Sequence, residues 1–196
     1  MWNERYTGDD YFYGTEPNTF LAENAQLLAG PVLSLCEGEG RNAVFLAALG
    51  LDVLGVDSSD VGLAKAQKLA AARNVTIRTK VADLADFTPA PNTFGAVISI
   101  FAHLPSALRS RVYPLVERSL KPGGIILLEA YTLAQLPRTT GGPKDPDLLM
   151  SAIGLRQEFP GCEVILAREL DRHIAEGGHR AGGVGAVVQF LARKRG

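Results

Sequence analysis

Val32-Leu33-Ser34-Leu35-Cys36-Glu37-Gly38-Glu39-Gly40-Arg41-Asn42 is the stretch that decides the fold of this chain. Its first five residues form an apolar run typical of a buried strand, and glycines follow directly. Residues 42–49 are rich in alanine and leucine and end before Gly50, which predicts a helix with a glycine stop. A strand that passes through glycines into a helix presents the first helical N–H groups to a ligand.

Strand and helix patterns alternate along the rest of the chain. The expected strands are residues 52–57, 75–81, 94–100 and 125–129, and the expected helices are residues 60–73 and 105–119. Such alternation is typical of a parallel, doubly wound sheet with helices on both faces. A long irregular loop is expected at residues 131–146 and a short helix at residues 147–153.

The C-terminal region changes character. Residues 163–170 and 185–193 form two strand patterns with no helix between them, which predicts an antiparallel hairpin. The expected fold class is therefore α/β, with a Rossmann-like, doubly wound, seven-stranded mixed sheet that ends in this hairpin. The length of 196 residues suits a single domain spanning residues 1–196.

Composition excludes several classes of protein. The formal net charge is −1, whereas proteins that bind phosphate backbones usually carry a basic excess, so no nucleic-acid partner is expected. No apolar run approaches the ~20 residues that span a bilayer, and the polar start lacks a secretory signal. The two cysteines have no metal-ligand spacing, so no metal is expected and a cytoplasmic location is predicted. Monomer and homodimer both stay open.

Two carboxylates follow predicted strands and suggest what the glycine turn binds. Asp57 ends the strand at residues 52–57, where an acid can accept the hydroxyls of a ribose. Asp83 follows the strand at residues 75–81, where a carboxylate can accept the exocyclic amine of adenine. The sequence Gly38-Glu39-Gly40-Arg41-Asn42-Ala43 also matches a dinucleotide fingerprint, so the turn alone does not identify the ligand.

Other features oppose a dehydrogenase or a nucleoside triphosphatase. The chain contains no Tyr-x-x-x-Lys pair and no P-loop Gly-Lys-Ser/Thr, and only about 65 residues follow the strand at 125–129. A nicotinamide-dependent reductase therefore remains only as a lesser alternative.

The motifs together resemble class I S-adenosylmethionine-dependent methyltransferases. Residues 32–40, Gly55-Val56-Asp57, Ala82-Asp83 and Leu120-Lys121-Pro122-Gly123-Gly124 look like the successive motifs of that family, over nearly the whole chain. The nearest subgroup looks like the small methyltransferases related to the tellurite-resistance methyltransferase. The residues similar to that subgroup are Gly38-Glu39-Gly40-Arg41-Asn42, Glu176-Gly177-Gly178-His179 and the start from Trp2 to Phe20.

This resemblance implies a cofactor, S-adenosyl-L-methionine, and a set of site residues. The implied cofactor-binding residues are Glu37, Gly38, Glu39, Gly40, Arg41, Asn42, Asp57, Ser58, Ala82, Asp83, Leu84, Ile100 and Tyr13. The implied acceptor-binding residues are Tyr6, Tyr11, Glu176 and Arg180, and the catalytic candidates are His103, His179 and Tyr131.

The glycine turn departs from the common family motif at two positions. Ser34 stands where the motif has an acid, and Cys36 stands where it has a glycine. Glu37 is expected to supply charge toward the methionine ammonium of the cofactor in place of the missing acid.

The expected reaction is an in-line methyl transfer to a small-molecule acceptor, of an anionic or chalcogen type. The cofactor carries the reactivity, so the protein positions and desolvates the reactants. A protonated acceptor needs a general base, for which histidine is the natural group, whereas an ionised acceptor needs none. A binding module without turnover is the other open interpretation. The aromatic residues within positions 1–20 either form a lid over the sulfonium or pack as an arm on the core.

Overall fold

The computed structural model of the protein describes residues 2–174 and 183–196. The described strands form a seven-stranded sheet in the order β3-β2-β1-β4-β5-β7-β6. The strands are β1 (Val32–Leu35), β2 (Val53–Asp57), β3 (Arg78–Val81), β4 (Phe94–Ile100), β5 (Leu120–Tyr131), β6 (Cys162–Ile174) and β7 (Gly183–Lys194). Strands β1 to β5 pair in parallel, while β7 pairs antiparallel with both β5 and β6. The predicted doubly wound mixed sheet and its antiparallel C-terminal strands are confirmed.

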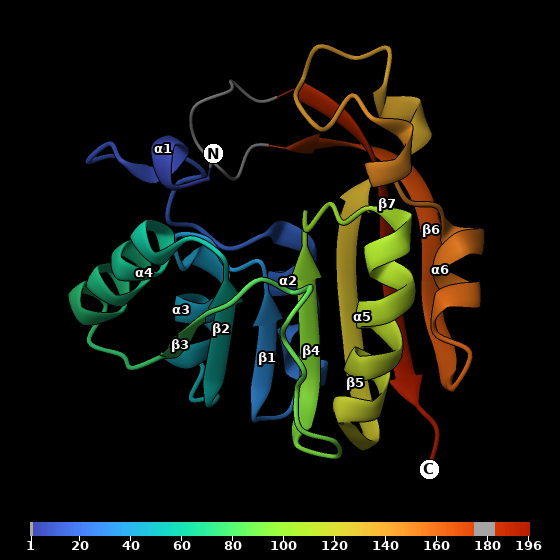
Figure 1. Ribbon diagram of the computed structural model, residues 1–196, viewed down its shortest axis with the longest axis horizontal. Helices are drawn as coiled ribbons and strands as arrows, with labels where there is room; N and C mark the ends of the chain where they lie inside the picture. The colour runs from blue at the N-terminus through green and yellow to red at the C-terminus, as the bar shows by residue number, and fades with distance from the viewer. Residues whose placement is uncertain (1, 175–182) are drawn as a thin grey trace.

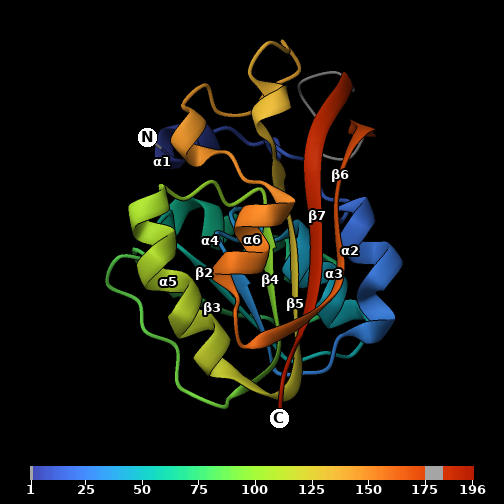
Figure 2. The same cartoon turned by 90° about the vertical axis from the view of Figure 1, so that its right-hand side faces the viewer.

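Helices cover both faces of this sheet. They are α1 (Trp2–Tyr6), α2 (Thr19–Asn24), α3 (Arg41–Ala48), α4 (Asp60–Ala72), α5 (Ser106–Ser119) and α6 (Ala152–Glu158), with 3₁₀ turns η1 (Ala25–Leu27), η2 (Leu133–Gln135) and η3 (Pro146–Leu148). Figure 2 shows α5 and α6 on one side of the sheet and α2 and α3 on the other. Because neighbouring strand residues point to opposite faces, Val97 packs into the core cluster under α5 and Ile98 into the cluster under α2 and α3.

Several element boundaries differ from the predictions, among them both C-terminal strands, which are longer than residues 163–170 and 185–193. Strand β3 begins at Arg78 because the N–H of Val75 donates to the carbonyl of Ala70 at the end of α4, and not to β2. Strand β5 extends further at both ends than residues 125–129. The helix predicted at residues 147–153 is replaced by η3 and by α6, which begins later because the Ser151 hydroxyl accepts from the N–H of Gly154.

The parallel strands all point toward one edge of the sheet, and two long segments lie beyond it. Figure 1 shows α1 above this edge on the side of α4, and the segment between β5 and α6 above it on the side of β7. Ligands of open α/β sheets bind at the carboxyl ends of the strands, so this edge is the place to look for a site. Over the part of the chain that the structure describes, none of the helices has the length and apolar character needed to cross a bilayer.

Candidate functional site

The two glycines of the turn between β1 and α3 are needed for different structural reasons. Gly40, with φ 95°, precedes α3, and a Cβ there would lie 2.6 Å from Cα of Ala66, so only glycine lets α3 approach α4. Gly38 has φ 62°, and a Cβ there would lie 2.9 Å from the hydroxyl oxygen of Tyr6. Gly40 therefore serves helix packing, whereas Gly38 presents bare backbone to whatever covers the turn.

Glu37 is buried and makes its contacts inside the protein. Its Oε1 accepts from the N–H of Ala43 at 2.9 Å, and its Oε2 accepts from the hydroxyl of Ser34. Burial raises the pKa of the Glu37 carboxyl to about 7. The acid missing from position 34 is thus replaced by a carboxylate that reaches back to Ser34 from the loop. The expected role of Glu37 toward the cofactor ammonium stays a prediction.

Asp57 lies at the end of β2 and is held by backbone donors. Its Oδ2 accepts from the N–H of Gly38 at 2.9 Å and its Oδ1 accepts from the N–H of Ser59 at 2.8 Å. Burial raises the pKa of Asp57, while these backbone bonds oppose that shift by stabilising the charged form. Each oxygen keeps a further lone pair that can accept a hydroxyl.

Asp83 lies at the same edge of the sheet. The N–H of Ala82 donates to the carbonyl of Asp57 at 2.9 Å, which brings the ends of β2 and β3 together. The Asp83 side chain is exposed and its Oδ1 accepts from the N–H of Ala85 at 2.8 Å, while the neighbouring Leu84 is buried. The strand ends thus place a second carboxylate beside an apolar side chain, which suits a flat base that carries an amine.

Gly38 and Gly62 together form a small cradle, which holds the ring of Tyr6. A Cβ at Gly62 would lie 2.9 Å from Cδ2 of Tyr6 and 3.1 Å from the carbonyl oxygen of Gly38. This cradle of bare backbone lies beside Asp57, whose Oδ2 accepts from the N–H of Gly38. Exposed backbone at Gly38 and the carboxylates of Asp57 and Asp83 at two strand ends are groups that fit an adenosine-containing cofactor.

Three aromatic rings lie at the carboxyl ends of β4 and β5 and form a second part of the site, here called the aromatic stack. The ring centroids of Phe101 and Tyr131 are 4.8 Å apart, and those of His103 and Tyr131 are 5.5 Å apart at an interplanar angle of 10°. Phe101 adopts φ 51°, an uncommon conformation for a non-glycine residue, and its N–H donates to the carbonyl of Glu129 at 2.7 Å. Strained backbone of this kind clusters at functional positions.

His103 has the properties of a neutral proton acceptor. Its Nδ1 lies 3.2 Å from the carbonyl of Leu148, which can only accept, so Nδ1 carries the proton and Nε2 carries a lone pair. This buried Nε2 meets no hydrogen-bond partner among the described residues. Burial lowers the pKa of His103 to about 4, so the ring is uncharged at neutral pH.

Several other predicted cofactor residues lie at this edge with contacts inside the protein. Ile100 is buried at the end of β4, and Arg41 begins α3. Asn42 accepts from the N–H of Asn18 through Oδ1 at 2.9 Å. Both oxygens of Glu39 engage protein groups, as described below.

The predicted residues of the N-terminal arm differ in exposure. Tyr6 is buried in the cradle, and the half-buried Tyr11 donates from its hydroxyl to the carbonyl of Lys65 at 3.1 Å. Tyr13 is exposed and accepts from Arg5. Ser58, beside Asp57, is exposed as well. Glu176, His179 and Arg180 lie outside the described residues.

A buried polar network was missed by the sequence analysis. Glu129 on β5 is fully buried and accepts from Arg172 on β6, from Gln189 on β7 at 2.7 Å and from Asn18 at 2.8 Å. The signal was present, because Glu129 is the one charged residue of the apolar run at residues 125–130. Through Asn18 and Asn42, this network joins the C-terminal strands to the start of α3.

Comparisons with known proteins agree with this geometry. The model of a methyltransferase domain matches residues 32–124. A 2-heptyl-1-hydroxyquinolin-4(1H)-one methyltransferase of Mycobacteroides abscessus is 30% identical over 125 residues, which are 61% of this chain and 55% of that protein. An uncharacterized methyltransferase, sll0829, of Synechocystis is 36% identical over 111 residues, 54% of this chain and 50% of that protein. The chain spans about half the length of these curated relatives.

Solved structures share the fold at lower identity. A structure that describes the conversion of a disulfide bond into a thioacetal group during echinomycin biosynthesis has a TM-score of 0.80 and 23% identity, covering 99% of this chain and 91% of the other. TehB from Haemophilus influenzae has a TM-score of 0.70 and 18% identity, covering 89% of this chain and 61% of its own. Residues 32–124, just under half of the chain, thus match the model of a methyltransferase domain, and the solved structures share the fold.

Proposed function

We propose that the protein transfers a methyl group from S-adenosylmethionine to a small-molecule acceptor. The observation that carries this proposal is the buried carboxylate of Asp57, which accepts from the N–H of Gly38 at the edge where the matched methyltransferase domain presents its strand ends. A neutral histidine with an available lone pair lies beyond the neighbouring strand β4. Cofactor-binding groups and a group able to take a proton thus follow adjacent parallel strands.

The cofactor would be held by groups at the ends of β1, β2 and β3. Asp57 would accept the ribose hydroxyls, Asp83 the adenine amine, and the backbone at Gly38 would face the methionine portion. When bound, S-adenosylmethionine supplies a methyl group activated on a sulfonium. Because Asp57 is already held by two backbone donors, it needs no rearrangement to accept a hydroxyl.

On the acceptor side, His103 would take the proton of a hydroxyl through Nε2. The bond from Nδ1 to Leu148 fixes the tautomer, and the stacked Tyr131 ring fixes the plane of the imidazole. An acceptor with an acidic hydroxyl on a flat ring suits this arrangement, because Phe101 and Tyr131 offer aromatic surface beside the base. The relative from Mycobacteroides abscessus is named for such a compound, a 1-hydroxyquinolone.

An anionic or chalcogen acceptor is the second candidate. The resemblance of the glycine turn and the N-terminal arm to the tellurite-resistance methyltransferases favours it, and TehB from Haemophilus influenzae shares the fold. An acceptor that is already ionised needs no general base, so His103 would then contribute only to packing.

Titration with S-adenosylmethionine, S-adenosylhomocysteine and NADH, followed by methyl-transfer assays, tests the proposal. Binding of the first two compounds with turnover of a hydroxylated aromatic is the expected result. Turnover of tellurite or selenite alone would favour the second acceptor class. Cofactor binding without turnover on either class would favour a binding module, and preference for NADH would overturn the proposal.

The remaining features of the proposal concern the whole molecule. We expect a single domain of residues 1–196, active as a monomer or homodimer, in the cytoplasm and without a nucleic-acid partner. Light scattering in solution and localisation of a tagged chain would check these expectations.

A further inference from the structure

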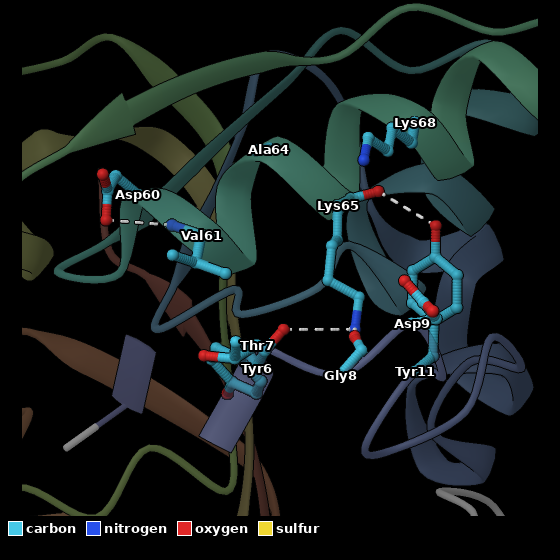
Figure 3. A pocket seen from close by; sticks show the side chains of 10 residues that line it. All are labelled: Tyr6, Thr7, Gly8, Asp9, Tyr11, Asp60, Val61, Ala64, Lys65 and Lys68. Carbon is cyan, nitrogen blue, oxygen red and sulfur yellow. Dashed lines mark hydrogen bonds between the residues drawn. The ribbon is translucent and has the colours of Figure 1, made fainter. Parts of the chain in front are cut away.

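The N-terminal arm, defined here as residues 2–13, is tied to the body of the protein by one buried lysine. Lys65 on α4 points toward the arm (Figure 3). Its ammonium donates to the carbonyl of Asp10 at 2.6 Å and to that of Gly8 at 2.8 Å. The carbonyl of Tyr6 lies at 3.4 Å. One side chain therefore holds three carbonyls of the arm.

The other partner of Lys65 comes from the glycine turn. Oε1 of Glu39 lies 2.5 Å from the Lys65 ammonium, and Oε2 accepts from the N–H of Phe12 at 2.7 Å. The side chains of Lys65 and Glu39 are only 10% and 4% exposed. A buried ion pair is maintained only when further hydrogen bonds satisfy its members, as the arm carbonyls do here.

Other polar contacts join the arm to α4: Asn3 donates to Asp60 and accepts from the Ser59 hydroxyl, and the Tyr11 hydroxyl donates to the carbonyl of Lys65. A cavity of about 340 Å³ lies between the two, lined by arm residues such as Thr7 and Asp9 and by Lys65 and Lys68 on α4 (Figure 3). Because the arm spans a hollow here, polar contacts carry much of its attachment beside the packing of Tyr6 on Gly62. The pair of Lys65 and Glu39 is the centre of these contacts and is called the latch below.

The latch positions the first helix, α1, with its last residue in the cradle of Gly38 and Gly62. The ring of Tyr6, the last residue of α1, lies against Gly38 and Gly62, and Trp2 stacks on Tyr6 with ring centroids 5.7 Å apart. Glu39 is one residue from Gly38 and Lys65 is one helical turn from Gly62. Both members of the latch are thus anchored on the two walls of the cradle that the arm covers.

We infer that Lys65 is a positioning residue that, with Glu39, latches the arm beside Asp57 of the proposed cofactor site and so controls cofactor exchange. The inference rests on the proposed cofactor site. It assigns Glu39 to the arm, in place of the direct cofactor contact that the motif suggests. The latch must open for the cofactor to pass and closes again to retain it.

The test uses the double variant Lys65→Met and Glu39→Gln. This variant removes both charges together, so neither is left buried and unpaired, and the glutamine can still accept from Phe12. Lys68→Met is the matched control, because it also removes an α4 lysine charge beside the cavity but leaves the pair of Lys65 and Glu39 intact. Trp2, the single tryptophan of the chain, reports on the arm through its fluorescence anisotropy.

The double variant should show lower Trp2 anisotropy and faster cleavage of the arm by protease, both without any ligand. S-adenosylhomocysteine should then dissociate about tenfold faster, with no slowing of its association, while Lys68→Met matches the parent. Glu39→Gln alone should give an intermediate rate, and it serves as the second variant if the double variant loses its cooperative thermal transition.

Two results would overturn the inference separately. Unchanged anisotropy and protease resistance would show that Lys65 and Glu39 do not hold the arm. A loosened arm with an unchanged dissociation rate would show that the arm does not control exchange. If the parent protein binds no S-adenosylhomocysteine, the proposed function fails, while the ligand-free readouts still decide whether the latch holds the arm.

Discussion

The proposed cofactor-binding part of the site, called the cofactor edge below, and the proposed acceptor-binding part, called the acceptor edge, are built in opposite ways. At the ends of β1 and β2, the carboxylates of Glu37 and Asp57 are each held by backbone N–H groups and lie beside bare glycine backbone. At the ends of β4 and β5, the aromatic stack includes His103, whose Nε2 has no hydrogen-bond partner in the described part of the chain. The cofactor edge is polar, and its two carboxylates already accept hydrogen bonds from protein groups. The acceptor edge is aromatic, and the lone pair of His103 Nε2 accepts none from the described residues.

This difference separates binding from chemistry. Satisfied carboxylates are rigid and can hold a ligand without rearrangement. An unpartnered buried acceptor costs about 1–3 kcal/mol, so it persists where it has a use. The comparison therefore predicts that substitutions at the first edge change cofactor affinity or stability, and that substitutions at the second edge change turnover.

The largest effect is expected at His103. His103→Asn keeps a donor for the Leu148 carbonyl but removes Nε2, so kcat should fall about a thousandfold, within the range for loss of a general base. Because the pKa of His103 is about 4, the parent rate should be level between about pH 6 and pH 8 and fall with the base form as pH drops toward 4. Steady-state kinetics with a hydroxylated aromatic acceptor checks both results.

Tyr131→Phe is the control for this prediction, because it keeps the ring that stacks on His103. Its kcat should stay within a few fold of the parent. A large loss of kcat in Tyr131→Phe together with a small loss in His103→Asn would exchange the roles assigned to the two residues.

The next effect is a pH dependence of stability caused by Glu37. Its folded pKa of about 7 lies above the ordinary value of 4.5, so its contribution is fully present below about pH 4.5 and is lost as pH rises through 7. Glu37→Gln cannot ionise, and its amide can serve both Ser34 and Ala43. Relative to the parent, its free energy of unfolding should therefore gain about 3 kcal/mol between pH 4.5 and pH 8.

Urea denaturation of both proteins across this pH range measures the difference. Curves that stay parallel would show that Glu37 ionises normally in the folded protein.

The smallest effect is expected at Asp57. Asp57→Ala removes the acceptor for the ribose and leaves the N–H groups of Gly38 and Ser59 without their partner. The Kd for S-adenosylhomocysteine should rise about 30-fold, which corresponds to about 2 kcal/mol. Asp57→Asn keeps one carbonyl oxygen and should lose less. Calorimetry that finds equal affinity for Asp57→Ala and the parent would contradict the placement of the cofactor.

Much of the cofactor edge could be predicted because its signals are local in sequence. A strand followed by glycines, with an acid at the end of the next strand, forces these groups to one edge of any parallel sheet. Strand β4 matched its predicted bounds at residues 94–100, since a continuous apolar run buried on both faces leaves little choice of boundary. Strand β3 did not, because an edge strand has a neighbour on one side only and its first residues bonded to α4 instead.

The acceptor edge was less accessible to prediction because its contacts join distant parts of the chain. His103 was a candidate by residue type, but its tautomer depends on Leu148, 45 residues away. The network around Glu129 joins residues from Asn18 to Gln189. Nothing in the local pattern of any one segment indicates these partners.

The sequence by itself determined the order of strands and helices, the glycine turn and the carboxylates at the strand ends, because each follows from periodicity and backbone conformation within a few residues. Only the tertiary structure decided the use of individual polar groups. In the folded protein, the Glu37 carboxyl accepts from the Ser34 hydroxyl, and the Glu39 carboxylate forms an ion pair with Lys65. The physical reason is that a buried charge must find a partner wherever the fold brings one, and that partner is set by packing between elements far apart in the chain.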